Sequence, residues 1–358
     1  MKRRDLLKLG TMGSLTACSN PNRLEVNATT NEYFNWRMAT TWPPNFPGLG
    51  AGALNLKRYI EDASQGRIRI ELYAANELIP PFEVFDAVSQ GSIEMGHSGA
   101  YYWRGKAEAV QFFSSVPFGM NAHEVNAWIY YGGGLELWTE VYEPFGVIPF
   151  PAGNSGVQMG GWFNKRIDTI EDLIGLRMRL PGIGGEVLRR AGGVPLTLPG
   201  AELFTALSTG ALDATEWVGP YNDIAFGLHQ AARYYYYPGW HEPGPIMECI
   251  INQSAYEGLP SDLQAIVRVA CQAANLDMIS EYNARNARSL SQLRNNEDVE
   301  ILSFPADVLN ELKKLTGEVI EELIARDAQS ARVWSSYQGF MSQSKVWLNI
   351  SEKSYLSL

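Results

Sequence analysis

Apolar positions along this chain switch between two periods, the alternation typical of strands and the longer spacing typical of one helix face. In the first half of the chain, β-rich segments alternate with helical segments. The predicted strands are residues 36–42, 67–73, 93–100, 147–150 and 158–164, and the predicted helices are residues 54–63, 82–89, 124–131 and 135–145. The first three strands and the helices between them predict an α/β fold with a parallel sheet and right-handed crossovers. The strands at 147–150 and 158–164 are predicted to cross into a second unit.

A second strand and helix unit occupies residues 175–220. Its predicted strands are residues 176–180, 194–198 and 214–218, with helices between them, and a helix at 223–232 and a strand at 234–237 follow. Arg179 closes the first of these strands, and the pair Glu216-Trp217 belongs to the third. Side chains at strand ends meet ligands at the mouth of a mostly parallel sheet. We therefore expect Arg179 and Glu216 to face one crevice, where the guanidinium holds an anion and the carboxylate helps to hold a cation.

The last third of the chain is mostly helical. A strand at 246–252 returns to the first unit, and Ser261 with Gln264 forms a capping-box pattern that predicts the start of a long helix. A further helix follows around Val308, and a final helix begins at about Ala331. The final helix carries the large apolar residues Trp334, Tyr337, Met341 and Trp347. We expect them to pack on their own chain, and a helix shared in a homodimer is the open alternative.

Two such units joined by more than one crossing indicate two domains with a hinge and a cleft. The predicted first domain combines residues 33–155 with residues 246–300, and the second, ligand-facing domain is residues 156–245. Residues 301–358 are predicted to form C-terminal helices. The chain of 358 residues is long enough for two α/β domains.

The first residues differ from the rest of the chain. Arg3 and Arg4 precede a short, weakly apolar run, which is typical of a twin-arginine export signal at residues 1–17 followed by a polar tether at 18–32. The residues that end at Cys18 also resemble a bacterial lipobox, so a lipid anchor at Cys18 and a freely diffusing exported form both stay open.

The net charge of −10 limits the partners that fit this chain. An acidic protein lacks the basic face that nucleic acid requires. A small anionic ligand then needs a locally reversed field, which an arginine, a bound cation or both can supply. Beyond the signal, the cysteines are Cys249 and Cys271. We expect buried free thiols there, and a disulfide between them stays open.

Several segments together resemble the solute-binding proteins of TRAP transporters, the tripartite ATP-independent periplasmic carriers. These segments are residues 175–182, 202–213, 216–220 and 235–244, and the whole resemblance runs from about Arg37 to Asp327. It implies a two-domain periplasmic binding protein fold with a hinge cleft and long C-terminal helices. It also implies a location in the periplasm and membrane permease subunits as partners.

Within that family, the chain is similar to the branch that binds 2-oxo or 2-hydroxy monocarboxylates together with a metal ion. The similarity lies in Gln158, Glu216-Trp217 and the turn that contains Glu242. It implies that Arg179 pairs with the ligand carboxylate. It further implies that Gln158, Glu216, the main-chain carbonyl of Trp217 and Glu242 surround the cation. Some members of this branch are dimers with an extended C-terminal helix.

The chemistry of these residues agrees with such roles. The fork of an arginine matches a carboxylate with two parallel hydrogen bonds. An all-oxygen shell suits Na⁺ or Ca²⁺, and the choice between them stays open. The site would hold three negative charges, from Glu216, Glu242 and the ligand carboxylate, against the one positive charge of Arg179. Burying this excess of negative charge requires a cation or a protonated glutamate. Tyr101 and Trp217 are predicted to wall the pocket, with plain core packing as the alternative.

The predicted function is delivery of a small 2-oxo monocarboxylate, such as pyruvate, to a permease. The alternative is an enzyme, a metal-assisted lyase or hydrolase that acts on a 2-oxo acid. Enzyme motifs are weak here. The segment from Gly96 has Ala100 where a nucleophile elbow requires glycine, and His123-Glu124 lacks the second histidine of a zinc motif.

Overall fold

The structure is a computed structural model that describes residues 32–358. The predicted export signal, Cys18 and the tether up to residue 31 lie outside the described residues. The segment Tyr33–Leu358 forms one compact unit, which contains two sheets. Among residues 32–358, no helix combines the length and the apolar character that crossing a bilayer requires.

The first sheet has the strand order β2-β1-β3-β10-β4. Its strands are β1 (Phe34–Thr40), β2 (Ile68–Tyr73), β3 (Met95–Ser98), β4 (Val147–Asn154) and β10 (Ile246–Asn252). β2 and β3 run parallel to β1, whereas β10 runs antiparallel to both β3 and β4. β10 is buried along almost its whole length, as expected for a strand with neighbours on both sides.

The second sheet has the strand order β11-β9-β5-β8-β6-β7. Its strands are β5 (Gly161–Phe163), β6 (Arg177–Arg179), β7 (Val194–Leu196), β8 (Ala214–Thr215), β9 (Tyr234–Tyr237) and β11 (Glu300–Ser303). β6 runs parallel to β7 and β8, and β9 runs parallel to β11. β5 is antiparallel to β8 and β9.

Three stretches carry the chain between the sheets, namely residues 155–160, 238–245 and 253–299, and the first two are neighbours. The last residue of β4, Asn154, pairs with the first residue of β10, Ile246. In the second sheet, Gly161 at the start of β5 pairs with Tyr236 near the end of β9. A strand that leaves and a strand that returns at the same point must be antiparallel, as β4 and β10 are in the first sheet and β5 and β9 are in the second. The predicted parallel pairing is confirmed for β1, β2 and β3. We call residues 155–160 and 238–245 the crossing segments.

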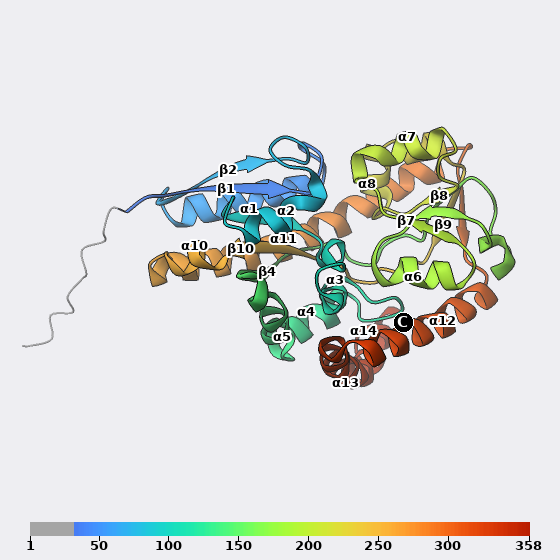
Figure 1. The fold of residues 1–358 in the computed structure, drawn as a ribbon. Coiled ribbons are helices and arrows are strands. Elements are labelled where there is room, and N and C mark those ends of the chain that lie inside the picture. Colours follow the sequence, from blue (N-terminus) through green and yellow to red (C-terminus); the bar gives the residue numbers. More distant parts are fainter. Residues whose placement is uncertain (1–31) are drawn as a thin grey trace, which may run out of the picture. The chain divides into compact units, whose positions relative to one another are not determined.

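The helices lie between and after the strands (Figure 1). They are α1 (Leu49–Ala63), α2 (Val84–Ser89), α3 (Gln111–Ser114), α4 (Ala122–Tyr131), α5 (Gly134–Tyr142), α6 (Gly182–Arg190), α7 (Leu203–Ser208), α8 (Pro220–Ala225), α9 (Leu228–Ala231), α10 (Gln253–Glu257), α11 (Ser261–Arg294), α12 (Ala306–Arg326), α13 (Ala328–Ile350) and α14 (Glu352–Leu356). Short 3₁₀ helices occupy Pro81–Glu83, Ala100–Trp103, Glu108–Val110, Glu143–Phe145, Ile170–Leu173 and Gly200–Glu202. The mixture of two sheets and long C-terminal helices confirms the predicted α/β class.

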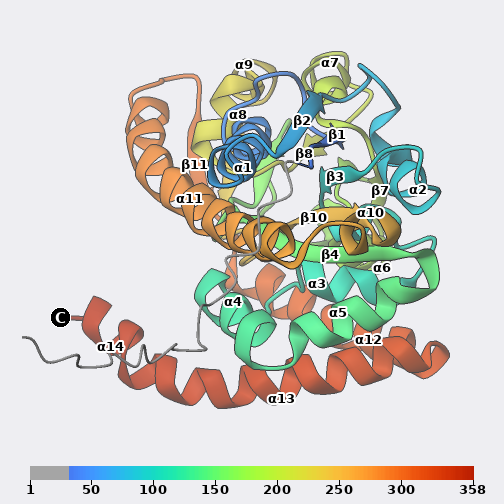
Figure 2. The ribbon, with the colours of Figure 1, turned by 90° about the vertical axis from the view of Figure 1, so that its left-hand side faces the viewer.

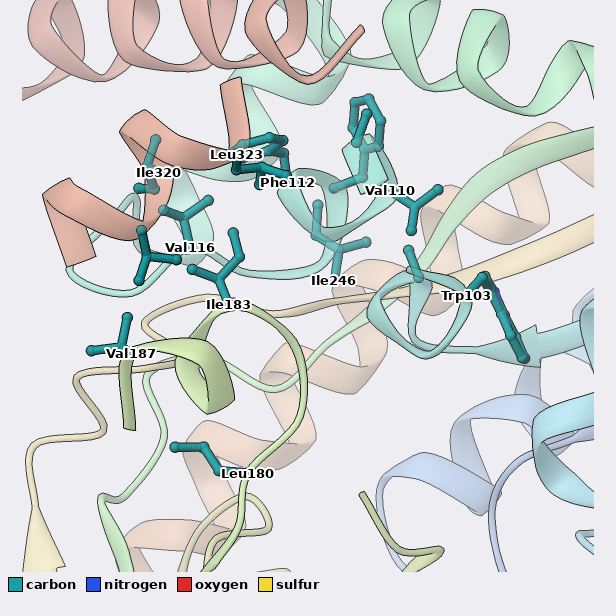
Figure 3. Close-up of a cluster of buried hydrophobic side chains, with 14 of the residues drawn as sticks. Trp103, Val110, Phe112, Val116, Leu180, Ile183, Val187, Ile246, Ile320 and Leu323 are labelled. Carbon is teal, nitrogen blue, oxygen red and sulfur yellow. The ribbon is translucent and has the colours of Figure 1, made fainter. Parts of the chain in front are cut away.

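A buried apolar cluster joins segments that are far apart in the sequence (Figure 3). Ile183 and Val187 of α6 lie in it with Phe112 of α3. Ile320 and Leu323 of α12 complete this part of the cluster, and α12 contacts α6 directly. Burying such side chains stabilises the fold by roughly 1.5–3 kcal/mol each, so α12 is an integral part of the core.

The final long helix packs on its own chain over its first half. Figure 2 shows α13 alongside α4 and α5, which it contacts. Val333 and Tyr337 are buried, and the Tyr337 hydroxyl accepts a hydrogen bond from the Met120 N–H at 2.8 Å. The apolar side chains near the C-terminus are exposed. They are Val346, Trp347 and Ile350 in α13, Tyr355 and Leu356 in α14, and Leu358 after it. The expected packing is therefore confirmed for the first half of the helix and wrong for its end.

Several predicted boundaries are wrong. α11 begins at Ser261 with Pro260 as the flanking residue, and no side chain caps it. The Gln264 side chain donates instead to the carbonyls of Tyr256 and Leu259, so the predicted capping box does not form. The helix predicted at 223–232 is two helices, α8 and α9, because Gly227 adopts a left-handed conformation between them. β11 was not predicted.

Cys249 and Cys271 are both free and buried. Burial, followed by a hydrogen bond with Cys271, raises the pKa of the Cys249 thiol well above its usual value. These observations agree with the expected buried thiols.

Candidate functional site

Gln158 and Glu242 meet where the two crossing segments lie next to each other. Gln158 Nε2 donates to Glu242 Oε2 at 2.8 Å and to Ser155 Oγ at 3.2 Å. The main-chain N–H of Gln158 also donates to the carbonyl of Glu242 at 3.2 Å. Both side chains are buried, at 4% exposed each. The crossing segments therefore hold an amide and a carboxyl group inside the protein.

Arg179 and Glu216 meet at the ends of neighbouring strands. Arg179 is the last residue of β6, and Glu216 follows β8, which runs parallel to β6. Because parallel strands end at the same edge, their terminal side chains emerge together. Arg179 Nη1 donates to Glu216 Oε1, and the two side chains are 1% and 0% exposed. This ion pair is fully buried, so both charges depend on their neighbours.

Aromatic side chains surround this ion pair. The Arg179 guanidinium lies 5.0 Å from the centre of the Trp217 ring, within range of a cation–π interaction. Arg179 Nη2 donates to the Tyr102 hydroxyl at 2.9 Å. Tyr101 and Tyr102 belong to the 3₁₀ helix Ala100–Trp103, which follows β3 of the first sheet. A hydroxyl from the first sheet thus contacts the arginine of the second.

The electrostatics of the cluster are governed by burial. Burial, and after it the negative charge of Glu216, raises the pKa of Glu242 well above its usual value. Burial is the largest single effect on the pKa of Arg179 and acts to lower it, but the acidic groups around the guanidinium, Glu216 first among them, together outweigh burial. The pKa is therefore raised and the guanidinium stays charged. Burial also raises the pKa of Tyr101 well above its usual value. Two glutamates facing one arginine leave an excess of negative charge whenever both are ionised.

Four side chains in this region have buried polar atoms without a hydrogen-bond partner. Among the described residues, Gln158 Oε1 and Glu216 Oε2 lack a donor, and the indole N–H of Trp217 lacks an acceptor. Both ring nitrogens of His241 are also without a hydrogen bond, although Nε2 lies 3.5 Å from Glu216 Oε2. Buried polar atoms are almost always partnered. These atoms indicate room for further hydrogen bonds or for coordination.

The residues present fit a hard cation. Two buried oxygen atoms without donors, Gln158 Oε1 and Glu216 Oε2, come from an amide and a carboxylate, the ligand types that Na⁺ and Ca²⁺ prefer. Glu242 is tied to the same amide group through Gln158 Nε2. Gln158, Glu216 and Glu242 offer no thiolate, the ligand type that softer metals prefer.

A small cavity of about 10 Å³ adjoins the cluster. It is lined by Trp42, Leu49, Tyr101, Tyr102, Gln158, Trp217, Val218 and Met247. Trp42 is held by a hydrogen bond from its indole N–H to His97 Nδ1 at 2.8 Å. A surface hollow of about 940 Å³ lies along β1 and β2 and contains none of the candidate residues. We place the site at the small cavity because the charged cluster is there.

The structure brings all the predicted site residues together, namely Arg179, Gln158, Tyr101, Trp217, Glu216 and Glu242. Sequence reasoning did not name Trp42, Leu49 or Met247, since apolar residues in strands and helices carry no signal that separates a pocket wall from a core. His241 belongs to the turn that carries the resemblance, but sequence reasoning assigned no role to its side chain.

The fold and the buried cluster define a two-sheet binding protein whose polar groups converge where the chain crosses between its sheets. The profile of the bacterial extracellular solute-binding protein family 7 (DctP) matches residues 38–327. The chain belongs to this family. It is a solute-binding protein of the TRAP type and not an enzyme, so the lyase or hydrolase alternative is not supported.

Similar proteins have described ligands. The chain is 40% identical to a monocarboxylate 2-oxoacid-binding periplasmic protein of Nostoc sp., over 99% of this chain and 98% of that protein. A TRAP periplasmic solute-binding protein from Pseudoalteromonas atlantica, with bound sodium and pyruvate, is 43% identical with a TM-score of 0.89, covering 91% of this chain and 99% of its own. A protein from Colwellia psychrerythraea, with bound calcium and pyruvate, has the same identity, TM-score and coverage.

A third solved structure, from Bordetella bronchiseptica, is 34% identical with a TM-score of 0.89, covering 91% of this chain and 97% of its own. It is described as a mixed occupancy dimer with calcium and picolinate bound at one site.

Proposed function

We propose that this protein binds a small 2-oxo monocarboxylate, of the size of pyruvate, together with a Na⁺ or Ca²⁺ ion. The observation that carries the proposal is the convergence of Arg179, Glu216, Gln158 and Glu242 in one buried cluster with oxygen atoms that lack donors. Relatives that are 40% and 43% identical are described as binding 2-oxo acids or pyruvate.

Arg179 is the group that holds the ligand carboxylate. Its guanidinium is buried and keeps its charge, and the Tyr102 hydroxyl and Trp217 ring restrict its orientation. A carboxylate is matched by two parallel N–H groups of an arginine, which a lysine does not offer. Tyr101 and Trp217, both nearly buried, exclude water from the same place.

The cation is held by four groups, namely the side chains of Gln158, Glu216 and Glu242 and the main-chain carbonyl of Trp217. When bound, the cation supplies positive charge that balances the carboxylates and the anionic ligand in a buried site. The identity of the ion, Na⁺ or Ca²⁺, stays open, since relatives are described with each.

The partners follow from the family. A TRAP solute-binding protein delivers its ligand to membrane permease subunits, and we propose the same for this chain in the periplasm. The twin-arginine pattern at Arg3 and Arg4 supports export, and acylation of Cys18 stays an open alternative to free diffusion.

We also propose that a second copy of the chain pairs with the first through the end of α13. Val346, Trp347 and Ile350 are exposed there, and the relative described as a dimer is 34% identical. Exposed apolar residues in a contiguous group are typical of an interface.

The test is calorimetry of the purified protein with pyruvate, 2-oxobutanoate, a longer 2-oxo acid, lactate and succinate. Each titration is run in sodium buffer, in sodium-free choline buffer with calcium, and in choline buffer with chelator. We expect pyruvate to bind in one or both cation buffers and not in the last. Binding of pyruvate that is equal in all three buffers, or the absence of binding, overturns the proposal.

A further inference from the structure

Asp223 is a buried carboxylate that the roles given above do not use. It lies in the first turn of α8 and is 1% exposed. Its Oδ1 accepts hydrogen bonds from the main-chain N–H groups of Val218 at 3.3 Å and Gly219 at 3.2 Å. Its Oδ2 accepts from Trp162 Nε1 at 3.0 Å and from the Tyr235 hydroxyl at 2.7 Å.

Asp223 thereby connects two strands of the second sheet to a short loop. Trp162 is in β5 and Tyr235 is in β9, and their rings stack with centres 4.0 Å apart. The loop on the other side of the carboxylate begins directly after Glu216 and contains Val218 and Gly219. The loop is therefore tied to the second sheet through one side chain.

The bond to Val218 fixes the direction of a neighbouring carbonyl. The N–H of Val218 and the C=O of Trp217 belong to the same peptide unit. In a planar trans peptide these two groups point in opposite directions. When the N–H points at Asp223, the Trp217 carbonyl points away from it. Within the described part of the chain, no hydrogen bond reaches that carbonyl oxygen.

We propose that Asp223 is a positioning residue for the cation site, because it holds the Trp217–Val218 peptide so that the Trp217 carbonyl faces the cation. This inference rests on the proposed function. Partners of metal-ligating groups orient them in the same way in other proteins, and their loss typically lowers metal affinity by about 10- to 100-fold.

A simpler role for Asp223 is to stabilise the start of α8, since Oδ1 also accepts from Gly219 at the residue before that helix. That role predicts a loss of stability but no selective loss of cation affinity. The two roles are separable with variants that disturb different oxygens of the same carboxylate.

Three variants make this separation. Asp223→Ala removes all the bonds. Asp223→Asn keeps an oxygen for Val218 and Gly219 and turns its NH₂ toward Tyr235, whose hydroxyl can accept a hydrogen bond. The Trp162 N–H then loses its acceptor, so this variant is expected to lose stability. Tyr235→Phe is the matched control, because it removes one bond to Oδ2 and leaves Oδ1 in place.

Calcium and sodium affinity are measured by calorimetry in the presence of pyruvate. We expect Asp223→Ala to weaken cation affinity by at least about tenfold. Asp223→Asn and Tyr235→Phe are expected to stay within about threefold of the wild type. Thermal unfolding of each variant reports the loss of stability separately.

A direct readout is available because the sequence contains Trp-Val only at residues 217–218. Labelling tryptophan with ¹³C at the carbonyl and valine with ¹⁵N therefore gives one peptide correlation in an NMR experiment. In the wild type we expect the carbonyl ¹³C shift to change when calcium or sodium is added with pyruvate. In Asp223→Ala we expect a different amide shift before addition and a smaller carbonyl change after it.

The outcomes are distinct. A folded Asp223→Ala with wild-type cation affinity overturns the inference, and so does a Tyr235→Phe variant that is as impaired as Asp223→Ala. If Asp223→Ala does not fold, the wild-type carbonyl shift decides, and its absence on binding also overturns the inference. Those results leave the proposed function intact, whereas failure of the wild type to bind pyruvate with either cation overturns the proposed function itself.

Discussion

Arg179 shows how a single buried charge is stabilised in this protein. Its side chain is 1% exposed, and its partners are the Glu216 carboxylate, the Tyr102 hydroxyl, the Leu198 carbonyl and the face of Trp217. Removing one partner of a buried ion pair leaves the other charge uncompensated, at a cost of about 3–5 kcal/mol. Arg179 is the one guanidinium of the cluster. It can therefore form the ion pair with a ligand carboxylate that it now forms with Glu216.

We predict that Arg179→Met abolishes pyruvate binding and that Arg179→Lys weakens it by at least about tenfold, because lysine lacks the planar fork. Calorimetry measures the affinity, and thermal unfolding shows whether each variant is folded. The matched control is Arg177→Met on the same strand, since Arg177 is half exposed and pairs with Asp213 outside the cluster. Wild-type affinity in a folded Arg179→Met would contradict the ligand assignment.

We propose that the apolar wall of the small cavity limits the length of the ligand. Leu49, the first residue of α1, lines this cavity and is 2% exposed. We predict that Leu49→Ala shifts the preference from pyruvate toward longer 2-oxo acids by about tenfold in the affinity ratio, since the added space accepts roughly two methylene groups at about 0.8 kcal/mol each.

The control for this prediction is Leu56→Ala, which empties a fully buried position on the same helix that does not line the cavity. Both variants are expected to lose about 2–5 kcal/mol of stability. Equal affinity ratios in Leu49→Ala and Leu56→Ala would show that Leu49 does not set ligand length.

At the scale of elements, β10 carries a second buried carboxyl group that is independent of the site. Glu248 is fully buried, and it accepts hydrogen bonds from Trp103 Nε1 at 2.5 Å and from the Tyr142 hydroxyl at 2.7 Å. Burial raises the pKa of Glu248 to about 7, against an ordinary value of 4.5, although both hydrogen bonds oppose the rise. An interior strand of the first sheet therefore carries a proton at mildly acidic pH.

This shift makes stability depend on pH with a definite sign. The folded state binds the Glu248 proton more tightly than the unfolded state, so the contribution is complete below pH 4.5 and is lost as the pH rises through about 7. We predict that Glu248→Gln flattens the fall in unfolding free energy between pH 5 and pH 8, by up to about 3 kcal/mol. Urea unfolding at several pH values measures it.

The control is Glu71→Gln on β2, where the carboxylate is exposed. It should leave the pH profile as in the wild type. Burial also raises the pKa of Asp223 to about 7. Asp223 therefore lowers the unfolding free energy with rising pH in the wild type and in Glu248→Gln alike, so the difference between these two pH profiles isolates Glu248. Parallel profiles for the wild type and Glu248→Gln would contradict the assignment.

At the scale of the whole Tyr33–Leu358 unit, the candidate residues meet where two of the three crossings between the sheets lie next to each other. Gln158 and Glu242 stand on the crossing segments, Arg179 and Glu216 stand at strand ends of the second sheet, and Tyr102 follows a strand of the first. We predict that a ligand bound there contacts residues from both sheets. The hinge and the division into two domains stay predictions, and ligand-dependent tryptophan fluorescence of the wild type can test them.

The end of α13 is the other feature of this scale. We predict that the wild type is a dimer by light scattering after size exclusion and that Trp347→Glu together with Ile350→Glu converts it to a monomer. Both side chains are about two-thirds exposed, at 66% and 69%. Burying two more carboxylates in an apolar contact is strongly unfavourable. Gln343→Glu, an exposed position on the same helix, is the control, and a wild type that is monomeric at all concentrations would contradict the prediction.

Local patterns predicted much of this molecule. Hydrophobic periodicity indicated the strands that became β1, β2 and β10, and the apolar spacing around Val308 indicated α12. Such patterns are local, because the residues that share one face of a strand or helix recur at a fixed spacing along the sequence. β11 was missed since a four-residue strand at a sheet edge has a mixed burial pattern and no clear alternation.

What the sequence by itself determined was the α/β class, the order of most elements, and the charged residues capable of binding an anion and a cation, together with the family they resemble. Only the tertiary structure decided that these charges are buried and adjacent, that the crossing strands are antiparallel, and that Asp223 holds the loop beside Glu216. The physical reason is that burial, pairing and peptide orientation depend on groups far apart in the chain, whose distances no local pattern records.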